Sequence, residues 1–267
     1  MNLSLRDPAF VARLTGGTVS PPVGPPYPGD LIAHWSAESV SLADGTPVDA
    51  VPDGSGNGNG LEQTYTSPDY RPLFKTNQVN GRPAFRFAVN GDRQRFFYTS
   101  TEFYRTLTEA TFFVVARFDQ DPGVGSYLGF TCWNHGYADA YPYTDGNGYV
   151  TFGSTDRKSV GNPSLALNAW RRHAFTAAPG AWTLELDHGQ VHTTATNTVG
   201  WLGAGIKAMV GLSYWSGGGA PTQPPPTGSG AVFGFSGLIA EMLFYRRALS
   251  AGERGTVDGY LKRRYGL

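Results

Sequence analysis

One stretch of the sequence holds the side chains best suited to bind a sugar. Between residues 133 and 147, aromatic rings alternate with amides and carboxylates among Gly and Pro. Flat rings stack on the apolar C–H face of a sugar, while amides and carboxylates bond to its hydroxyls. Such rings equally suit a contact with another protein. The candidate glycan or partner contacts are Trp133, Asn134, Tyr137, Asp139, Tyr141 and Tyr143, joined by Tyr214 and Trp215 from a later segment.

Two carboxylates on alternate residues, Glu185 and Asp187, suggest glycoside hydrolysis. Side chains two apart on a strand share a face, and this reaction needs two carboxyls at a controlled separation. The segment, however, runs directly into His188-Gly189, which has the composition of a hairpin turn. We therefore interpret the pair as a solvent-facing polar stripe and expect no catalytic residues. Glu241, on another strand, is either a lone acid or a polar contact inside the fold.

Metal sites are weakly indicated. The loop 53–59 is rich in oxygen, but calcium takes about six to eight oxygens, usually from several carboxylates, and the loop provides one Asp. We interpret it as a glycine-permitted turn in which Asp and Asn bond to the backbone. No cofactor is expected. Calcium is the alternative, at a site formed across loops by Asp119, Asp121, Asp139 and Asp145. His188 and His192 lie across a predicted hairpin, and the lone Cys132 is expected to be a small buried hydrophobe.

These groups must be positioned by β-strands. Segments rich in β-branched and aromatic residues, bounded by Gly, Asn, Asp or Pro, recur at 31–36, 84–89, 111–118, 126–133, 149–152, 170–177, 181–187, 190–195 and 208–214. Near the end, residues 237–245 predict a strand that is apolar on both faces, with Leu238, Ala240, Met242 and Phe244 alternating with Ile239, Glu241, Leu243 and Tyr245. A capping box at Ser250 and Glu253 then predicts a helix over about 251–264.

This last segment resembles the closing strand and helix of the concanavalin A-like (laminin-G-like) jelly-roll superfamily. Residues 32–38, 42–45, 51–61 and 80–87 resemble the opening strands and loops of the same modules. The resemblance implies an all-β, concanavalin A-like jelly-roll sandwich with a C-terminal helix. Because such folds host lectins, glycosidases and structural proteins, the fold does not choose the function. A glycoside hydrolase using Glu185 and Asp187 and a free carbohydrate-binding lectin are the alternatives that it leaves open.

The first thirty residues differ from the rest. Residues 7–14, followed by Gly16-Gly17, predict a helix of about two turns, which is marginal alone in water. Its apolar side chains need cover from the domain itself or from a partner chain; they are Leu3, Leu5, Phe10, Val11 and Leu14. The Pro-rich residues that follow predict an extended spacer of about 3.1 Å per residue. The expected organisation is an anchoring arm at 1–19, a linker at 20–30 and a jelly-roll domain at 31–267.

Composition gives the expected compartment. Lys plus Arg and Asp plus Glu number 21 each, so no net charge attracts nucleic acid. No apolar run approaches the roughly 20 residues that span a bilayer, and the N-terminus lacks the pattern of a secretory signal. We expect synthesis in a host cytoplasm. A lectin-like module without an export signal suits a phage virion protein, a capsid decoration or a tail-attached protein displayed on the virion surface. The expected partners are a capsid or tail protein, through residues 1–20, and a cell-surface glycan, but neither nucleic acid nor membrane.

Overall fold

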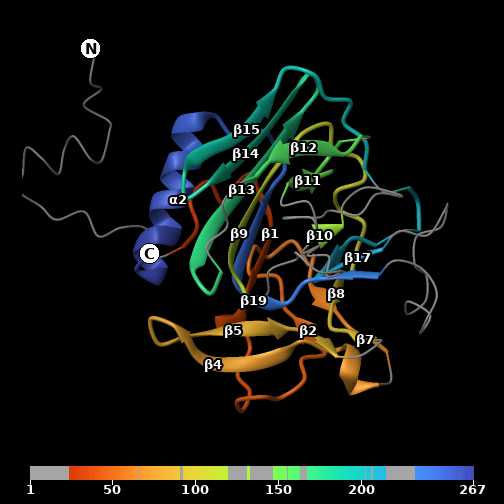
Figure 1. Cartoon of the computed structure of the whole chain (residues 1–267), viewed down its shortest axis with the longest axis vertical. Coiled ribbons are helices and arrows are strands. Elements are labelled where there is room, and N and C mark those ends of the chain that lie inside the picture. The colour runs from red at the N-terminus through yellow and green to blue at the C-terminus, as the bar shows by residue number, and fades with distance from the viewer. Residues whose placement is uncertain are drawn as a thin grey trace, which may run out of the picture.

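The computed structural model describes residues 24–65, 67–90, 93–119, 131–132, 147–154, 156–162, 167–201, 203–205, 207–214 and 232–267. Within these residues the chain forms an eight-stranded sheet, a five-stranded sheet, three strand pairs and a C-terminal helix (Figure 1). The predicted all-β jelly-roll sandwich with a C-terminal helix is confirmed. The predicted N-terminal helix at 7–14 lies outside the described residues.

The large sheet is antiparallel, in the order β15-β14-β13-β9-β19-β5-β4, with β1 also paired to β19. Its strands are β1 (Leu31–Ser36), β4 (Leu73–Val79), β5 (Arg82–Phe87), β9 (Ala110–Phe118), β13 (Trp170–Ala178), β14 (Ala181–Leu186), β15 (Gly189–Thr194) and β19 (Gly237–Tyr245). The turn between β14 and β15 is the predicted hairpin, in which Asp187 and His188 both adopt positive φ angles, of 51° and 65°. Residues other than glycine adopt positive φ angles mainly in such tight turns.

The second sheet has short strands in the order β10-β16-β8-β3-β2. They are β2 (Ala50–Val51), β3 (Leu61–Glu62), β8 (Phe97–Thr99), β10 (Thr131–Cys132) and β16 (Met209–Val210). The remaining pairs are β6 (Val89–Asn90) with β7 (Arg93–Gln94), β11 (Gly148–Val150) with β12 (Lys158–Gly161), and β17 (Leu212–Tyr214) with β18 (Val232–Gly234). Two single 3-10 turns, η1 (Ala37–Ser39) and η2 (Pro68–Tyr70), connect strands. The strand expected over 208–214 is therefore broken at Gly211, whose φ is 90°.

The main core lies between the two sheets. Phe85, Phe112 and Phe244 of the large sheet meet Leu61 and Phe97 of the second sheet there, and all five are at most 1% exposed. On its other face the large sheet is covered by α2 (Ala251–Tyr265), as Figure 1 shows. The molecule therefore has three layers, in which the central strands β9 and β19 of the large sheet are buried on both faces.

The central strand β19 shows why the large sheet is apolar on both faces, and where strict alternation fails. All nine of its residues are buried, as predicted. Its register with β9 shifts between Ile239 and Glu241. A bulge of this kind adds one residue and reverses the facing of those that follow. Hence the helix side receives Leu238, Ala240, Leu243 and Tyr245, and the inter-sheet side receives Ile239, Met242 and Phe244. The predicted grouping of Leu238 and Ala240 with Met242 and Phe244 is wrong for this reason.

The C-terminal helix begins and ends as its sequence predicts. The Ser250 side chain accepts from the Glu253 N–H, and the Glu253 carboxylate accepts from the Ser250 N–H at 2.8 Å, completing the capping box. Gly266 ends the helix in the left-handed conformation, with φ 63°. Val257 and Leu261 of this helix are at most 1% exposed against the sheet. The helix is thus part of the folded core.

The described part of the Pro-rich segment lies against the domain. The Pro26 carbonyl accepts a hydrogen bond from the Tyr245 hydroxyl at 2.9 Å. The Arg247 guanidinium lies 6.0 Å from the centre of the Tyr27 ring and donates to Asp30 at 2.8 Å. Residues 24–30 are therefore fixed to the last turns of the sandwich.

Candidate functional site

The outer face of the second sheet carries a group of aromatic side chains. In β8, Phe97 and Thr99 point into the core with no exposure, so Tyr98 between them points outward. Tyr98 is flanked in register by Glu62 of β3 and Met209 of β16. The three side chains therefore form one row across the sheet, on the face away from the core.

Four rings gather around this row. The Tyr65 ring centre lies 5.8 Å from Phe96, 5.8 Å from Tyr70 and 6.4 Å from Tyr98, in tilted or edge-on arrangements. Edge-to-face contacts of this kind stabilise aromatic pairs beyond the area that they bury. Met209 packs against this group from the neighbouring strand, so the rings have an apolar side chain beside them.

Backbone contacts hold these rings in place. The Gln63 side-chain amide, which is 1% exposed, donates to the Phe96 carbonyl at 2.8 Å and to the Tyr70 carbonyl at 3.3 Å. The Arg71 guanidinium donates to the Tyr65 carbonyl at 3.2 Å. These bonds join the segment 63–71 to the strand that carries Tyr98, so the site is built before any ligand arrives.

Polar groups lie beside the same rings. The Tyr98 hydroxyl accepts from the Thr64 N–H at 3.2 Å and shares a hydrogen bond with the Thr64 hydroxyl. The Lys207 ammonium lies 5.0 Å from the centre of the Tyr98 ring and forms an ion pair with Glu62. Burial, with smaller contributions from Tyr98 and Tyr70, raises the pKa of Tyr65 to about 12. The Tyr65 hydroxyl is thus protonated at neutral pH, as an ordinary tyrosine is, and can donate a hydrogen bond to a ligand oxygen.

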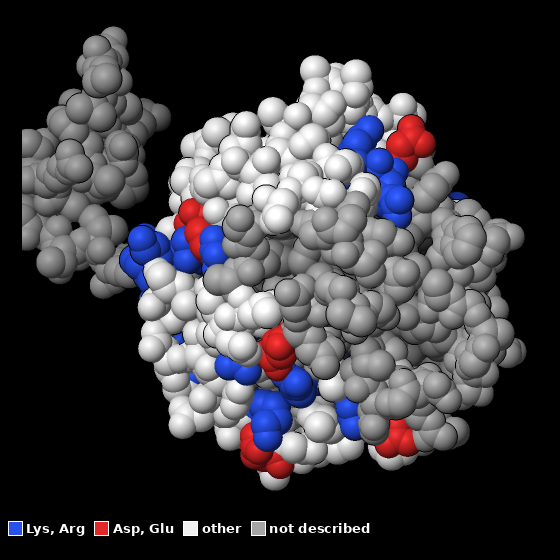
Figure 2. All heavy atoms as spheres, viewed as in Figure 1, with Lys and Arg blue, Asp and Glu red and all other residues white. Residues whose placement is uncertain are grey.

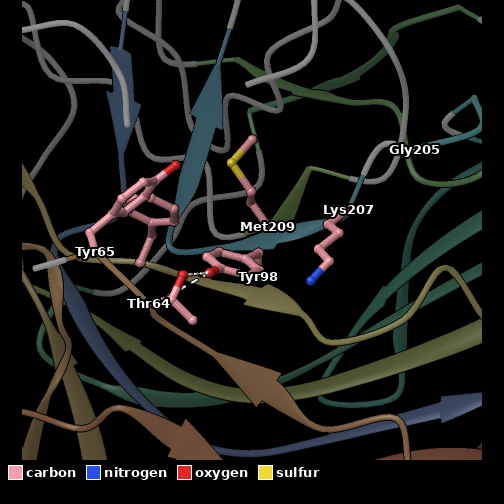
Figure 3. Close-up of a pocket in the computed structure, with 7 residues that line it drawn as sticks. Thr64, Tyr65, Tyr98, Gly205, Lys207 and Met209 are labelled. Atoms are coloured by element: carbon pink, nitrogen blue, oxygen red, sulfur yellow. Dashed lines mark hydrogen bonds between the residues drawn. The ribbon is translucent and has the colours of Figure 1, made fainter. Parts of the chain in front are cut away.

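These residues enclose a hollow of about 260 Å³, drawn in Figure 3. Its described lining is Thr64, Tyr65, Phe96, Tyr98, Gly205, Lys207 and Met209. The hollow is smaller than the roughly 300–1,000 Å³ typical of sites for drug-sized ligands. Rings and a thioether, with hydroxyl groups among them, can stack on one face of a sugar and bond to its oxygens.

The candidate contacts named from the sequence lie largely outside the described residues. This holds for Trp133, Asn134, Tyr137, Asp139, Tyr141, Tyr143 and Trp215, and for the anchoring residues Leu3, Leu5, Phe10, Val11 and Leu14. Tyr214 is the last residue of β17, paired in register with Val232. The glycan or partner role of all these residues stays a prediction.

Both carboxylates of the acid pair, Glu185 and Asp187, accept hydrogen bonds from arginines. Glu185, 5% exposed, accepts from Arg254 of α2 at 2.7 Å. Asp187 lies in the hairpin turn, where it accepts from the Arg172 N–H at 2.9 Å and from the Arg171 side chain. The prediction of a solvent-facing stripe is wrong for Glu185, because α2 covers this end of β14. Each carboxylate instead ties its strand to a neighbouring element.

The Asp53 loop is a turn held by its own backbone, as interpreted from the sequence. One Asp53 oxygen accepts from the N–H groups of His34 and Ser55, each at 2.9 Å. The other accepts from the Ser55 hydroxyl at 2.8 Å and the Asn59 N–H at 2.9 Å. The Asn57 amide reaches the Leu31 carbonyl at 3.1 Å. The carboxylate is thus fully engaged in fixing the loop to β1.

Glu241 is a polar contact beneath the helix rather than a lone acid. Its fully buried side chain lies 2.7 Å from the His34 Nε2 atom and 2.9 Å from the Arg264 Nε atom. Arg264 also pairs with Glu38. These contacts connect β19, β1 and α2 at the bulge, where two successive residues face the helix side.

Two further findings concern metals and membranes. Within the described ranges, no three His, Cys, Asp or Glu residues gather at a place that could hold a metal ion. In that same part of the chain no helix has the length and apolar character needed to cross a bilayer.

The site residues Tyr65, Tyr98 and Lys207 were not among those named from the sequence. The sequence does contain a weak signal for them: Phe96-Phe97-Tyr98-Thr99 has the β-rich composition of a strand, and Tyr65 and Tyr70 lie in an earlier polar segment. Three strands remote in sequence must pair before these residues meet.

Comparison with known proteins supports the fold. No protein-family model matches the sequence, and no curated protein matches it either. Among solved structures, the chain is similar to domain 4 of AbnA, a GH43 extracellular arabinanase from Geobacillus stearothermophilus, in complex with arabinotriose. The two share 16% identity over 86% of this chain and 98% of that chain, with a TM-score of 0.56.

Two toxin domains are similar as well. The binding domain of Paraclostridial Mosquitocidal Protein 1 shares 13% identity over 89% of this chain and 53% of that chain, with a TM-score of 0.55. The ligand binding domain of botulinum neurotoxin serotype D, in complex with N-acetylneuraminic acid, shares 10% identity over 87% of this chain and 51% of that chain, with a TM-score of 0.56. This chain thus spans about half the length of both toxin chains. The similarity to all three confirms a sheet-rich jelly-roll sandwich.

Proposed function

We propose that this protein is a non-enzymatic glycan-binding module of the concanavalin A-like type, displayed on a phage virion. The observation that carries the binding role is the hollow formed by Tyr65, Tyr98 and Phe96 on the outer face of the second sheet. Tyr65 and Tyr98 are partly exposed there, and their rings pack against Met209 and Phe96. Half-exposed rings with hydroxyls beside them are the groups that stack on and orient a sugar.

Similar folds support this choice of ligand. The arabinanase domain is in complex with arabinotriose, and one toxin domain is in complex with N-acetylneuraminic acid. At 16% and 10% identity these structures carry no residue correspondence, so the sugar-binding role of this chain rests on its own hollow.

The absence of catalysis is part of the proposal. Glycoside hydrolysis needs two carboxyls that reach the scissile bond from either side. At the covered end of β14, the Glu185 carboxylate accepts a hydrogen bond from Arg254, and the Asp187 carboxylate accepts hydrogen bonds from Arg171 and Arg172. A hydrolase using this pair would first have to release the contacts that join β14 to α2 and β13, which favours a binding module.

Positive and negative side chains are mixed on the surface of the domain. On the face drawn in Figure 2, Lys and Arg side chains lie beside Asp and Glu, and the described residues there form no extended area of one sign. The described part of this face therefore carries no basic stripe of the kind by which proteins bind nucleic acid.

The virion role rests on the sequence pattern of residues 1–20, an apolar helix ahead of a Pro-rich segment. The structure refines its test, because Pro26, Tyr27 and Asp30 contact the domain and should be kept. Deleting residues 1–20 should therefore leave the sandwich folded but absent from purified particles. Particles that still carry the truncated chain would overturn the anchoring role.

The binding role is tested by exposing the full chain to a glycan array. Tyr98→Ala and Tyr65→Ala should each weaken the strongest interaction by at least about tenfold, the loss typical of a central aromatic contact. Trp170→Ala is the matched control: it too is half-buried beneath a cation, with Arg117 at 5.9 Å, but lies on the large sheet. Equal losses in all three variants, or no glycan bound by the unaltered chain, would overturn the proposal.

A further inference from the structure

The positive charge at the hollow is neutralised by a neighbouring carboxylate of the same chain. Among its described lining residues, Lys207 is the one that carries a formal charge at neutral pH. Its ammonium is paired with Glu62, which stands beside Tyr98 on the neighbouring strand. Glu62 is not itself among the described lining residues, but its contact with the Lys207 ammonium places it at the edge of the hollow. The lysine and glutamate side chains there are 40% and 30% exposed. A ligand therefore meets a pair whose charges cancel.

The direction of the lysine matters as well. Figure 3 shows the Lys207 side chain running past Tyr98, with its nitrogen at the end away from Tyr65 and Met209. The ammonium is held there by Glu62 on one side and the Tyr98 ring on the other. The part of the hollow between Tyr65 and Met209 is consequently lined by rings, a thioether and hydroxyl groups, which suit an uncharged ligand.

An acidic sugar would fit this arrangement poorly. Its carboxylate could reach Lys207 only by displacing Glu62 or by lying close to it, and two carboxylates around one ammonium repel each other. The hydroxyls of a neutral sugar meet no such penalty, because they can accept from the ammonium and donate to Glu62 together. Like-charge juxtaposition of this kind is a common way to reject the wrong ligand.

We propose that the Tyr65–Tyr98 hollow selects a single neutral sugar ring, and that Glu62, by neutralising Lys207, is the residue that rejects acidic sugars. This inference rests on the proposed glycan-binding function. The volume of about 260 Å³ fits one ring or the end of a chain rather than an extended oligosaccharide. Glu62 thus acts as a specificity residue at a site whose affinity comes from the tyrosines.

The test compares neutral and acidic probes on the full chain. The neutral probes are oligosaccharides ending in arabinose, galactose or glucose, and the acidic ones end in N-acetylneuraminic or glucuronic acid. Glu62→Gln leaves the Lys207 charge uncancelled, so the ratio of acidic to neutral affinity should rise by up to about fivefold, the scale of an exposed ion pair. Glu62→Ala should act in the same direction.

The matched control is Asp44→Asn. It removes the carboxylate from another exposed lysine pair, with Lys75, which lies outside the hollow. The ratio should not change in this variant. An unaltered chain that prefers acidic probes, or Glu62 variants whose ratio matches that of Asp44→Asn, would overturn the inference and leave glycan binding in place. An unaltered chain that binds none of the probes would overturn the proposed function as well.

Discussion

Replacing Glu241 should destabilise the fold far more than replacing an exposed acid. The Glu241 side chain has no exposure and lies 2.7 Å from His34 and 2.9 Å from Arg264. Removing one partner of a buried ion pair leaves an uncompensated charge and costs about 3–5 kcal/mol. Because Arg264 keeps its contact with Glu38, we expect Glu241→Ala to cost about 3 kcal/mol, at the lower end of that range.

Urea unfolding followed by tryptophan fluorescence measures this cost directly. Trp35 is fully buried, and its indole N–H donates to the Asn59 carbonyl at 2.6 Å, so its emission should report on the loss of the sandwich. The control is Asp44→Ala, which breaks an exposed pair and should cost far less. If Glu241→Ala costs no more than this control, then the contact among β1, β19 and α2 does not hold the helix in place.

Three further predictions concern the core and the acid pair. Burial lowers the pKa of His173 from 6.5 to about 4, so the unfolded chain binds a proton first as the pH falls. The free energy of unfolding should therefore decrease between pH 6.5 and about 4, by up to about 1.4 kcal/mol per unit, and His173→Phe should flatten this slope in urea titrations. Gly211→Ala should lower the melting temperature sharply, because φ is 90° there and a Cβ would meet the Phe87 ring; a value near that of the unaltered chain would contradict the packing. Glu185→Gln should cost about 3 kcal/mol in urea unfolding, since Arg254 loses its buried partner, but leave glycan binding unchanged.

The closing strand and helix could be predicted from sequence because their signals are local. Ser250 and Glu253 lie three residues apart, and each partner of their capping box is within this short segment. The alternation in β19, by contrast, fails after Ile239, where the strand bulges against β9. A bulge depends on the partner strand and on what Glu241 can reach, and the sequence of one strand contains neither.

The candidate site was harder to foresee for the same reason. Tyr65, Tyr98 and Lys207 are far apart in sequence and meet because β3, β8 and β16 pair. Sequence reasoning favoured the aromatic residues 133–143, which are concentrated in one stretch and so give a strong local signal. Glu185 shows the opposite error: it has the spacing of a solvent-facing residue, yet a helix more than sixty positions later covers it.

The most direct test of the account is a crystal structure of the full chain with the strongest glycan from the array. We expect a sugar ring stacked within the hollow against Tyr98, with its oxygens near Tyr65 and Lys207. A sugar bound instead against residues 133–143, with the hollow empty, would contradict it.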